Sequence, residues 1–341
     1  MATQLENDPL DRFRNEHFQN ILPQYYKSLL NQFQKINSSF FYFNLLFLTL
    51  ITCEFIFFFI SVPIMNESLL IASGLGAIFL TFFIYLILLF YNQAKKPEQI
   101  QQLLSQFITS CQLNLGSSEL ANQQHLAIAD ALMKLSQYLI DHEWKMLRFP
   151  FFQNGVSRFS AYFFWKDVFY FKQLILHEAI EAHFKQIRLT PTDLEVHTSL
   201  ASAYISLSQI YKISKDHPRE SFYKKREEYF EIKVQQSAKL AIEEFQILSG
   251  YAPNDPWVHE QLASGYHELR LFEQEINEME ILLRLRPHDM EILFRLGGLY
   301  FQQGQNSKGL QIYEALRQAN FKKAEDLISS YGCTSESKLV L

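Results

Sequence analysis

The sequence of 341 residues is poor in cysteine, glycine and proline, and it carries no excess of basic residues. Its three cysteines, Cys53, Cys111 and Cys333, are scattered without the spacing of a metal or redox site, which suits a reducing compartment. Eleven glycines, ten prolines and few alternating β-branched runs predict a chain that is nearly all helix. A net charge of −5 gives no overall basicity that would favour nucleic-acid binding.

Catalytic motifs are also missing. The sequence contains no Walker loop, no Gly-x-Ser-x-Gly and no GxGxxG. The stretch from His177 to His183 departs from the HExxH zinc motif, because Glu181 stands where the second histidine is required. We therefore expect a surface helix there, and no enzyme activity, metal or cofactor. No cleavable signal peptide is expected in the polar stretch before the first apolar segment.

Two apolar segments, about Phe40–Val62 and Ser68–Tyr91, contain Glu54 as their only formal charge. As a helix, each is long enough to cross a hydrocarbon core of about 30 Å. The break between them, Pro63–Glu67, is so short that the two helices must be antiparallel. The sequence therefore predicts a transmembrane hairpin over residues 39–92, with both ends of the chain on one side.

The distribution of lysine indicates which side that is. Lys27 and Lys35 precede the hairpin, Lys95 and Lys96 follow it, and the loop at its tip has no basic residue. The positive-inside rule then places both termini of this two-pass integral membrane protein in the cytoplasm. If the protein is exported by another route, the same side would face a host cell instead.

Glu54 is costly near the middle of a membrane and needs an explanation. A hairpin centred near Ile64 places it opposite residues 74–76, beside a face of small residues formed by Ser73, Ala77 and Thr81. Glu54 is expected to bond Ser73 or backbone in the seam, or to pair between copies of the chain in a homo-oligomer. Assembly with another membrane protein is an alternative. Ion or proton transport is the least favoured, because two helices with one acid cannot line a pathway.

The segments on either side of the hairpin leave alternatives open. Residues 1–38 read as an amphipathic helix that either lies on a membrane or self-associates, or packs back on the soluble domain. Residues 93–169 form a helical linker region. An aromatic-rich segment, 149–171, lies at the end of this region and continues past it. Three interpretations remain open: it packs in the core, it rests on the membrane, or it forms a docking surface. A stacking platform for single-stranded nucleic acid ranks lowest because the segment is only weakly basic.

The C-terminal half is periodic. Pro253 and Pro287 stand 34 positions apart, and the residues after them pair in kind: Leu262 with Leu296, Ala263 with Gly297, and Tyr266 with Tyr300. The same offsets after Pro191 give Leu200, Ala201 and Tyr204. This pattern resembles the tetratricopeptide repeat family over residues 170–331, which implies an α-solenoid following the hairpin.

Two features go beyond the regular repeat. Pro191 and Pro253 stand 62 positions apart, so this repeat carries about 28 extra residues around Lys212–Gln235, which form a candidate docking element. A last helix from about Phe321 to Tyr331 is expected to cap the solenoid, followed by a flexible tail over 332–341.

The resemblance implies binding of a protein or peptide in a concave groove lined by the first helix of each repeat. The expected groove residues are Trp257, Glu260, Ser264, His267, Glu268, Glu291, Phe294, Phe301 and Gln302. Glu260 and Ser264 occupy places where chaperone adaptors of the family clamp a carboxylate with Lys and Asn. A ligand with basic and apolar residues fits this groove better.

The sequence therefore predicts a membrane-anchored, all-α scaffold that recruits a protein partner to a bilayer. Two alternatives remain. The hairpin is similar in layout to the inclusion membrane proteins that obligate intracellular bacteria export, which would make this a host-facing scaffold. Glu54 would instead suit an accessory subunit of a transport or assembly complex in the plasma membrane.

Overall fold

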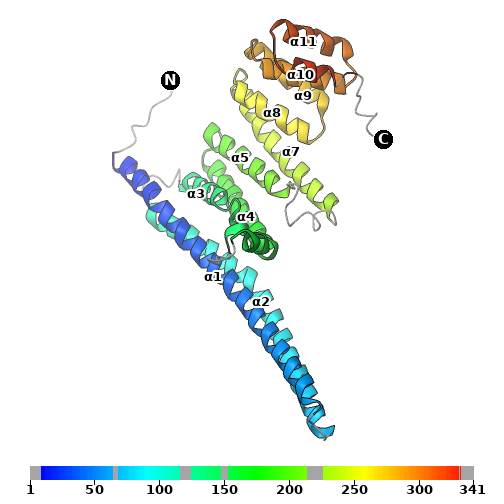
Figure 1. Ribbon diagram of the computed structural model, residues 1–341. Helices are drawn as coiled ribbons and strands as arrows, with labels where there is room; N and C mark the ends of the chain where they lie inside the picture. The colour runs from blue at the N-terminus through cyan, green and yellow to red at the C-terminus, as the bar shows by residue number, and fades with distance from the viewer. Residues whose placement is uncertain are drawn as a thin grey trace. The chain divides into compact units, whose positions relative to one another are not determined.

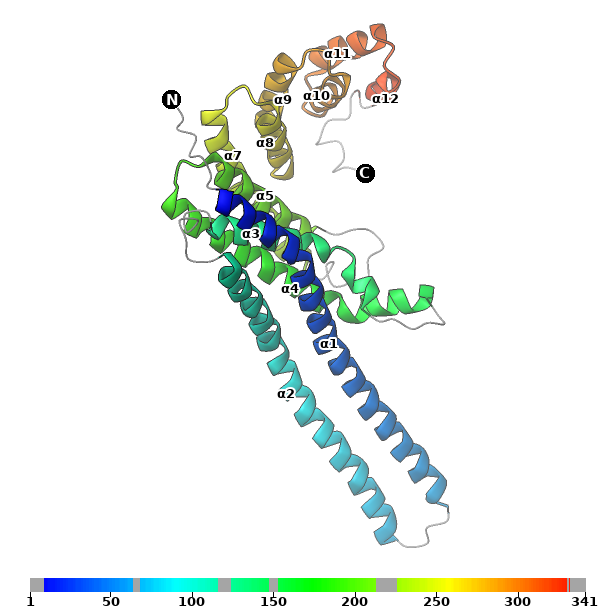
Figure 2. The ribbon, with the colours of Figure 1, turned by 90° about the vertical axis from the view of Figure 1, so that its left-hand side faces the viewer.

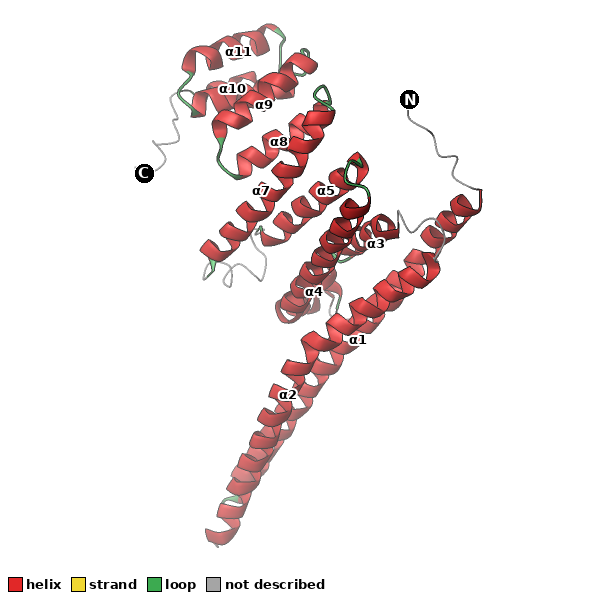
Figure 3. Ribbon diagram, turned by 180° about the vertical axis from the view of Figure 1, so that it is seen from behind, coloured by secondary structure: helices red, strands yellow, loops and turns green. Residues whose placement is uncertain are grey.

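A computed structural model describes residues 9–63, 68–115, 124–146, 153–212, 226–329 and 331. Within these ranges the regular elements are helices and none is a strand (Figure 3), which confirms the all-α fold class. The chain divides into two compact units, Met1–Ala182 and His183–Leu341. The predicted hairpin loop at 64–67, the middle of the insertion and the tail over 332–341 lie outside the described residues.

The first unit is built on two long helices. α1 (Pro9–Ser61) and α2 (Ser68–Leu115) run antiparallel and side by side (Figures 1 and 2). Pro23 lies inside α1 and Pro97 lies inside α2, but neither proline ends its helix. Each helix therefore continues from its polar part into its apolar part. Both are long and apolar enough to cross a membrane, with mean hydropathies of 2.2 and 2.3 over their most apolar stretches.

The polar part of α1 packs inside the first unit. Phe18, Leu22, Tyr26, Leu29 and Phe33 follow one another at three- or four-residue steps and are at most 3% exposed. Their neighbours include residues of α2, α3 (Gln124–Tyr138) and α4 (Gln153–Leu189), and the short η2 (His142–Lys145) lies between α3 and α4 in the chain. The Tyr26 hydroxyl donates a hydrogen bond to the carbonyl of Ala131 (2.9 Å), and the ring of Phe33 stacks on Phe171. Of the two readings of the N-terminal helix, packing against the chain is the one that the structure shows.

The aromatic segment lies mostly in α4 and has two faces. Phe164, Trp165 and Phe171 are buried, as the core alternative requires. Tyr162 and Phe163 are 65% and 47% exposed. Residues 149–152 of the segment lie outside the described ranges.

The second unit consists of helix pairs: α5 (Leu194–Tyr211) with α7 (Glu227–Tyr251), α8 (Pro256–Glu268) with α9 (Phe272–Leu285), and α10 (Met290–Gln302) with α11 (Asn306–Gln318) (Figure 1). The short α12 (Ala324–Ile328) packs on α10 and α11 at the end, where a cap was expected. Leu200, Leu262 and Leu296 are each at most 2% exposed, as their equivalent repeat positions predict. The predicted tetratricopeptide-like architecture is confirmed.

Each repeat starts and turns in the same way. Asp193, Asp255 and Asp289 are the N-caps of α5, α8 and α10, and each accepts a hydrogen bond from the backbone N–H two residues further on (3.0, 2.9 and 3.1 Å). The turns within the second and third pairs place Arg270 and Gly304, which occupy equivalent repeat positions, at positive φ (57° and 70°). Equivalent residues of the second and third repeats therefore keep the spacing of 34 positions in the turns as well as in the helices.

Small residues allow the helices to approach one another. A Cβ on Gly297 would lie 2.8 Å from Leu327 and 3.0 Å from Ile312, and one on Gly265 would lie 2.7 Å from Ile242. Such distances are too short for a side-chain carbon. Gly297 therefore allows α10 to pack closely against α11 and α12.

The insertion extends the first pair. α7 has 25 residues whereas α9 has 14, and in the shared register the extra residues are 227–237 at the start of α7. α5 likewise continues beyond the length of α8 by residues 207–211. The rings of Tyr211 and Phe230 meet between the two extensions at 6.2 Å. The insertion is therefore partly helical, and residues 213–225 lie outside the described part of the chain.

Candidate functional site

A groove of about 180 Å³ lies between α5, α7 and α8. Its walls come from the first helices of two repeats, including Ser208 and Gln209 on α5 and Ser264 and Glu268 on α8. Its floor is formed by apolar or small residues of α7, among them Ala241 and Phe245. Two of the predicted groove residues, Ser264 and Glu268, thus line a groove of the expected kind.

An ion pair spans the mouth of this groove. Lys212 Nζ lies 2.5 Å from Glu268 Oε1, and the two side chains are 42% and 30% exposed. A solvent-exposed pair of this kind contributes at most about 1 kcal/mol. A charged ligand could therefore replace either partner at low cost.

The remaining predicted residues of α8 lie in different surroundings. Trp257 is 38% exposed and packs edge-on against Phe245, and Glu260 is exposed. The Nδ1 of His267 lies 3.0 Å from Glu275, so this histidine bonds across the turn to α9. Burial raises the pKa of Glu275 above its usual range, although His267 opposes the shift.

On α10 two predicted groove positions contact another part of the chain. Glu291 pairs with Lys323 at 2.6 Å, and the ring of Phe294 lies 6.1 Å from that of Phe321. Both partners come from the segment that leads into α12. These two positions therefore already contact the cap.

The prediction that Phe301 faces the groove is wrong. Its ring is fully buried and meets the ring of Tyr331. Gly309 on α11 makes room for it, because a Cβ there would lie 2.5 Å from the ring. Helical spacing along α10 predicts which face Phe301 lies on, but it does not show that Gly309 on the neighbouring helix leaves space for the ring. Gln302, the next residue, is exposed.

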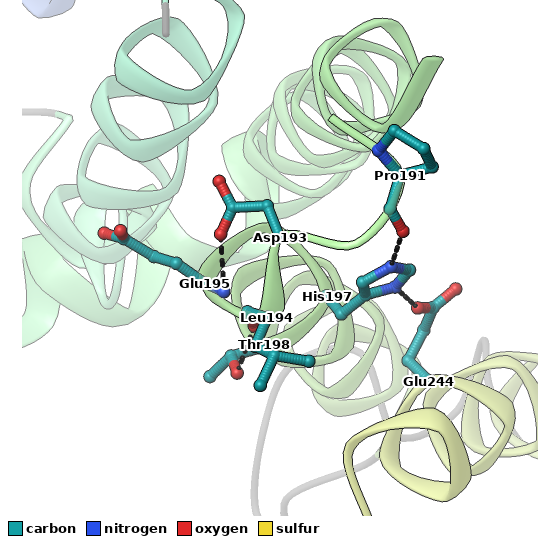
Figure 4. Close-up of polar contacts among 7 residues, drawn as sticks. All are labelled: Pro191, Asp193, Leu194, Glu195, His197, Thr198 and Glu244. Carbon is teal, nitrogen blue, oxygen red and sulfur yellow. Dashed lines mark hydrogen bonds and ion pairs between the residues drawn. The ribbon is translucent and has the colours of Figure 1, made fainter. Parts of the chain in front are cut away.

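Two histidine–glutamate pairs that the sequence analysis missed join the helices of the first two repeats. His197 of α5 lies 2.6 Å from Glu244 of α7 through Nδ1, and 3.0 Å from the carbonyl of Pro191 through Nε2 (Figure 4). His259 contacts Glu278 (2.6 Å) and the carbonyl of Pro253 (2.9 Å) in the same way. We call each set a histidine clamp.

A signal for the clamps was present in the sequence. His197 and His259 each stand six positions after the proline that opens their repeat, and Glu244 and Glu278 are separated by the same interval as Pro253 and Pro287. Burial acts to lower the pKa of His197, but the hydrogen bonds to Glu244 and to Pro191 outweigh it, so the pKa of His197 is raised. The clamp at His197 thus favours the protonated, doubly bonded imidazole.

The other histidines named from the sequence do not converge. His177 bonds the carbonyl of Gln173, and His183, which is buried rather than on the surface, lies 2.8 Å from the hydroxyl of Ser199. Among the described residues, no group of three or more His, Cys, Asp and Glu side chains is arranged to hold a metal ion.

Glu54 contacts a different residue from the one predicted. The hydroxyl of Thr81 donates to its Oε1 (2.9 Å), whereas Ser73 bonds the carbonyl of Leu70. Helical side chains lean toward the N-terminus of their own helix, so across an antiparallel seam Glu54 reaches further along α2 than a count from the loop suggests. The predicted small-residue face does contact Glu54, through Thr81, but the predicted register between α1 and α2 was wrong. Glu54 Oε2 is buried and has no hydrogen-bond partner among the described residues.

Comparisons with known proteins give structural likeness only. No family model and no curated protein matches the chain. Among solved structures, "MamA MSR-1 C2" is 16% identical, covering 60% of this chain and 97% of that one, with a TM-score of 0.31. MamA 41-end from Desulfovibrio magneticus RS-1 is 16% identical (56% and 94% covered, TM-score 0.25). TTC0263, a thermophilic TPR protein of Thermus thermophilus, is 20% identical (65% and 93% covered, TM-score 0.26).

Proposed function

We propose that this protein is a membrane-anchored scaffold that binds a protein partner in the groove between α5, α7 and α8. The groove carries this proposal, because it is concave, has an apolar floor and is bordered by charged and amide side chains. Its partner is a peptide or helix with apolar residues for the floor and a basic residue that pairs with Glu268 in place of Lys212.

The membrane anchor is supported by what the hairpin leaves exposed. Leu48, Phe57, Phe59 and Leu69 are between 64% and 75% exposed, and the most apolar stretches of the two helices are 0% and 6% buried. A helix in the core of a soluble protein would be covered, and exposed apolar patches of this extent are rare in soluble monomers. Together with the lysine distribution, this supports two spans with both termini in the cytoplasm.

The test is proximity labelling from a ligase fused to the C-terminus in the native cell. Ser264→Trp fills the groove, and Ser307→Trp serves as the control, because Ser307 of α11 is also exposed and does not line the groove. A partner labelled by the parent and by Ser307→Trp, but not by Ser264→Trp, supports the proposal once its purified form binds directly. Equal labelling by both variants would overturn the groove as the site. Extraction with alkaline carbonate tests the anchor separately, since an integral protein stays in the pellet.

The unpartnered Oε2 of Glu54 favours one second candidate, an accessory subunit of a membrane complex. Replacing Glu54 with Gln separates the two ideas. A scaffold keeps its partner and its membrane anchor, whereas a subunit whose carboxyl acts in the membrane loses the activity of its complex.

A further inference from the structure

A second cavity, of about 500 Å³, lies in the first unit where the apolar stretches of α1 and α2 end and α4 crosses them. Its volume is within the range of about 300–1,000 Å³ typical of small-molecule sites. Leu45, Leu48 and Leu89 from the hairpin and Phe163 from α4 contribute apolar walls, and Lys96 and Asp167 contribute charge. None of these residues belongs to the repeat groove.

The polarity of the cavity is graded along the hairpin. Because α1 and α2 are antiparallel, Leu48 and Tyr85 lie toward the hairpin tip, and Lys96 lies at the opposite, polar end. In a bilayer this places the apolar end among acyl chains and Lys96 at the headgroups. An amphipathic molecule of matching orientation would satisfy both ends.

The apolar walls are open rather than sealed. Leu45, Leu48 and Phe163, which line the cavity, are 44%, 64% and 47% exposed. A molecule can therefore enter sideways from the surroundings of the hairpin. In the anchored protein those surroundings are lipid.

Charge at the polar end favours an anion. Lys96 Nζ pairs with Asp167 at 2.6 Å, and Lys96 also lines an adjoining cavity of about 330 Å³ together with Lys35. Lys166 stands next to Asp167 and interacts with its carboxylate, so three lysines, Lys35, Lys96 and Lys166, outnumber the one carboxylate that lines the two cavities. Burial raises the pKa of Asp167, although Lys96 opposes the shift, so this carboxylate is poorly solvated.

We infer that this cavity binds one anionic phospholipid, with an acyl chain along Leu45, Leu48 and Leu89 and its phosphate at Lys96 and Lys35. The inference rests on the proposed membrane anchor. It adds to that anchor a specific lipid site that joins the hairpin to α4.

The test uses the full-length protein in detergent with added phosphatidylglycerol, and native mass spectrometry counts the lipid that each molecule retains. Leu48→Trp fills the cavity and should abolish retention of one lipid. Leu46→Trp is the matched control, because Leu46 is 60% exposed on the same helix and does not line the cavity. Equal retention by the two variants would mean non-specific lipid on the hairpin surface and would overturn the site.

The charge is tested with a variant that removes the buried pair as a whole. Lys96→Gln with Asp167→Asn leaves no unpaired charge and should weaken phosphatidylglycerol retention about tenfold, the effect of losing one charge-assisted hydrogen bond. Lys95→Gln, its neighbour outside both cavities, should change retention little. Wild-type protein that retains phosphatidylcholine as well as phosphatidylglycerol would contradict the anionic headgroup.

Carbonate extraction and partner labelling of the same variants separate this inference from the proposed function. If Leu48→Trp loses the lipid and remains in the membrane pellet with its partner bound, the site and the scaffold both stand. If wild-type protein binds no lipid and still resists carbonate, the site fails and the anchor stands. Complete release of wild-type protein by carbonate would mean that the anchor fails, and the lipid inference fails with it.

Discussion

The second repeat joins its helices with a histidine clamp, whereas the third repeat has apolar residues at the same positions. His259 and Glu278 meet between α8 and α9 at 2.6 Å. The residues 34 positions later are Leu293 and Ile312, and both pack in the hydrophobic cluster at the end of the solenoid. Both members of the polar pair have been exchanged together.

A second pair shows the same difference. In the second repeat His267 bonds Glu275 across the turn, with the glutamate side chain only 3% exposed. In the third repeat the equivalent residues are Phe301 and Gly309, and the phenyl ring fills the space that the glycine leaves. A bonded polar pair and an apolar pair of matching shape both pack stably, whereas a polar residue placed beside an apolar one loses its hydrogen-bond partner.

The largest effect is expected when one residue of the polar pair in the second repeat is replaced by its apolar equivalent from the third repeat. His259→Leu alone leaves Glu278, whose side chain is 17% exposed, without its hydrogen-bond partner and should cost about 3 kcal/mol of local stability. His259→Leu with Glu278→Ile copies the third repeat and should recover most of that loss. Hydrogen exchange over α8 and α9 in the full-length protein measures both. A double variant as unstable as the single one would show that the pairs are not interchangeable.

The next effect tests the space beside Phe301. Gly309→Val places a side chain within 2.5 Å of the ring and should cost about 1–3 kcal/mol by overpacking. Gly250→Val is the control, since a Cβ at Gly250 meets nothing within 4 Å. Thermal unfolding followed by circular dichroism compares the two, and similar losses would contradict the packing explanation.

A smaller effect is expected from pH. The pKa of His197 is raised in the folded chain above its ordinary value of 6.5, so the clamp's contribution is fully present below pH 6.5 and is lost as pH rises through the folded pKa. Opening of α5 and α7 should therefore become easier above pH 6.5. In the variant His197→Leu with Glu244→Ile this dependence should be weaker. Hydrogen exchange at several pH values, corrected for the intrinsic rate, decides the matter.

The smallest effect belongs to an exposed pair. Lys323→Ala breaks the contact with Glu291, whose side chain is 56% exposed, and should change stability by less than about 1 kcal/mol. The same thermal scan suffices. A loss as large as that of His259→Leu would show that exposed charges matter as much as buried ones in this solenoid.

The sequence predicted the features that depend on spacing. The helical class, the two apolar helices and the buried leucines of the repeats follow from periods that one chain displays. Gly297 was recognised because it stands opposite Ala263 in the repeat frame. These are properties of single helices or of one repeat compared with the next.

Features that depend on which side chain a neighbouring helix presents were missed. Helical spacing predicts that Phe301 lies on the groove face, but its ring is buried in the space beside Gly309. Glu54 accepts a hydrogen bond from Thr81 because its side chain points toward the N-terminus of α1. Counting residues from the hairpin loop does not take that direction into account. The histidine clamps are visible in the sequence as repeated offsets, but an offset does not show that the histidine meets a glutamate of the next helix.

The continuity of α1 has a mechanical consequence. Its 53 residues form one helix about 80 Å long, whose first half is part of the soluble core and whose second half is the apolar arm of the hairpin. Because α1 has no proline between Tyr26 and Ser61, a tilt of the arm also turns the buried residues that follow Pro23, which are Tyr26, Leu29 and Phe33. In the proposed membrane-anchored state the hairpin would act as a lever as well as an attachment, and changes in bilayer thickness or tension would reach the folded core as torque.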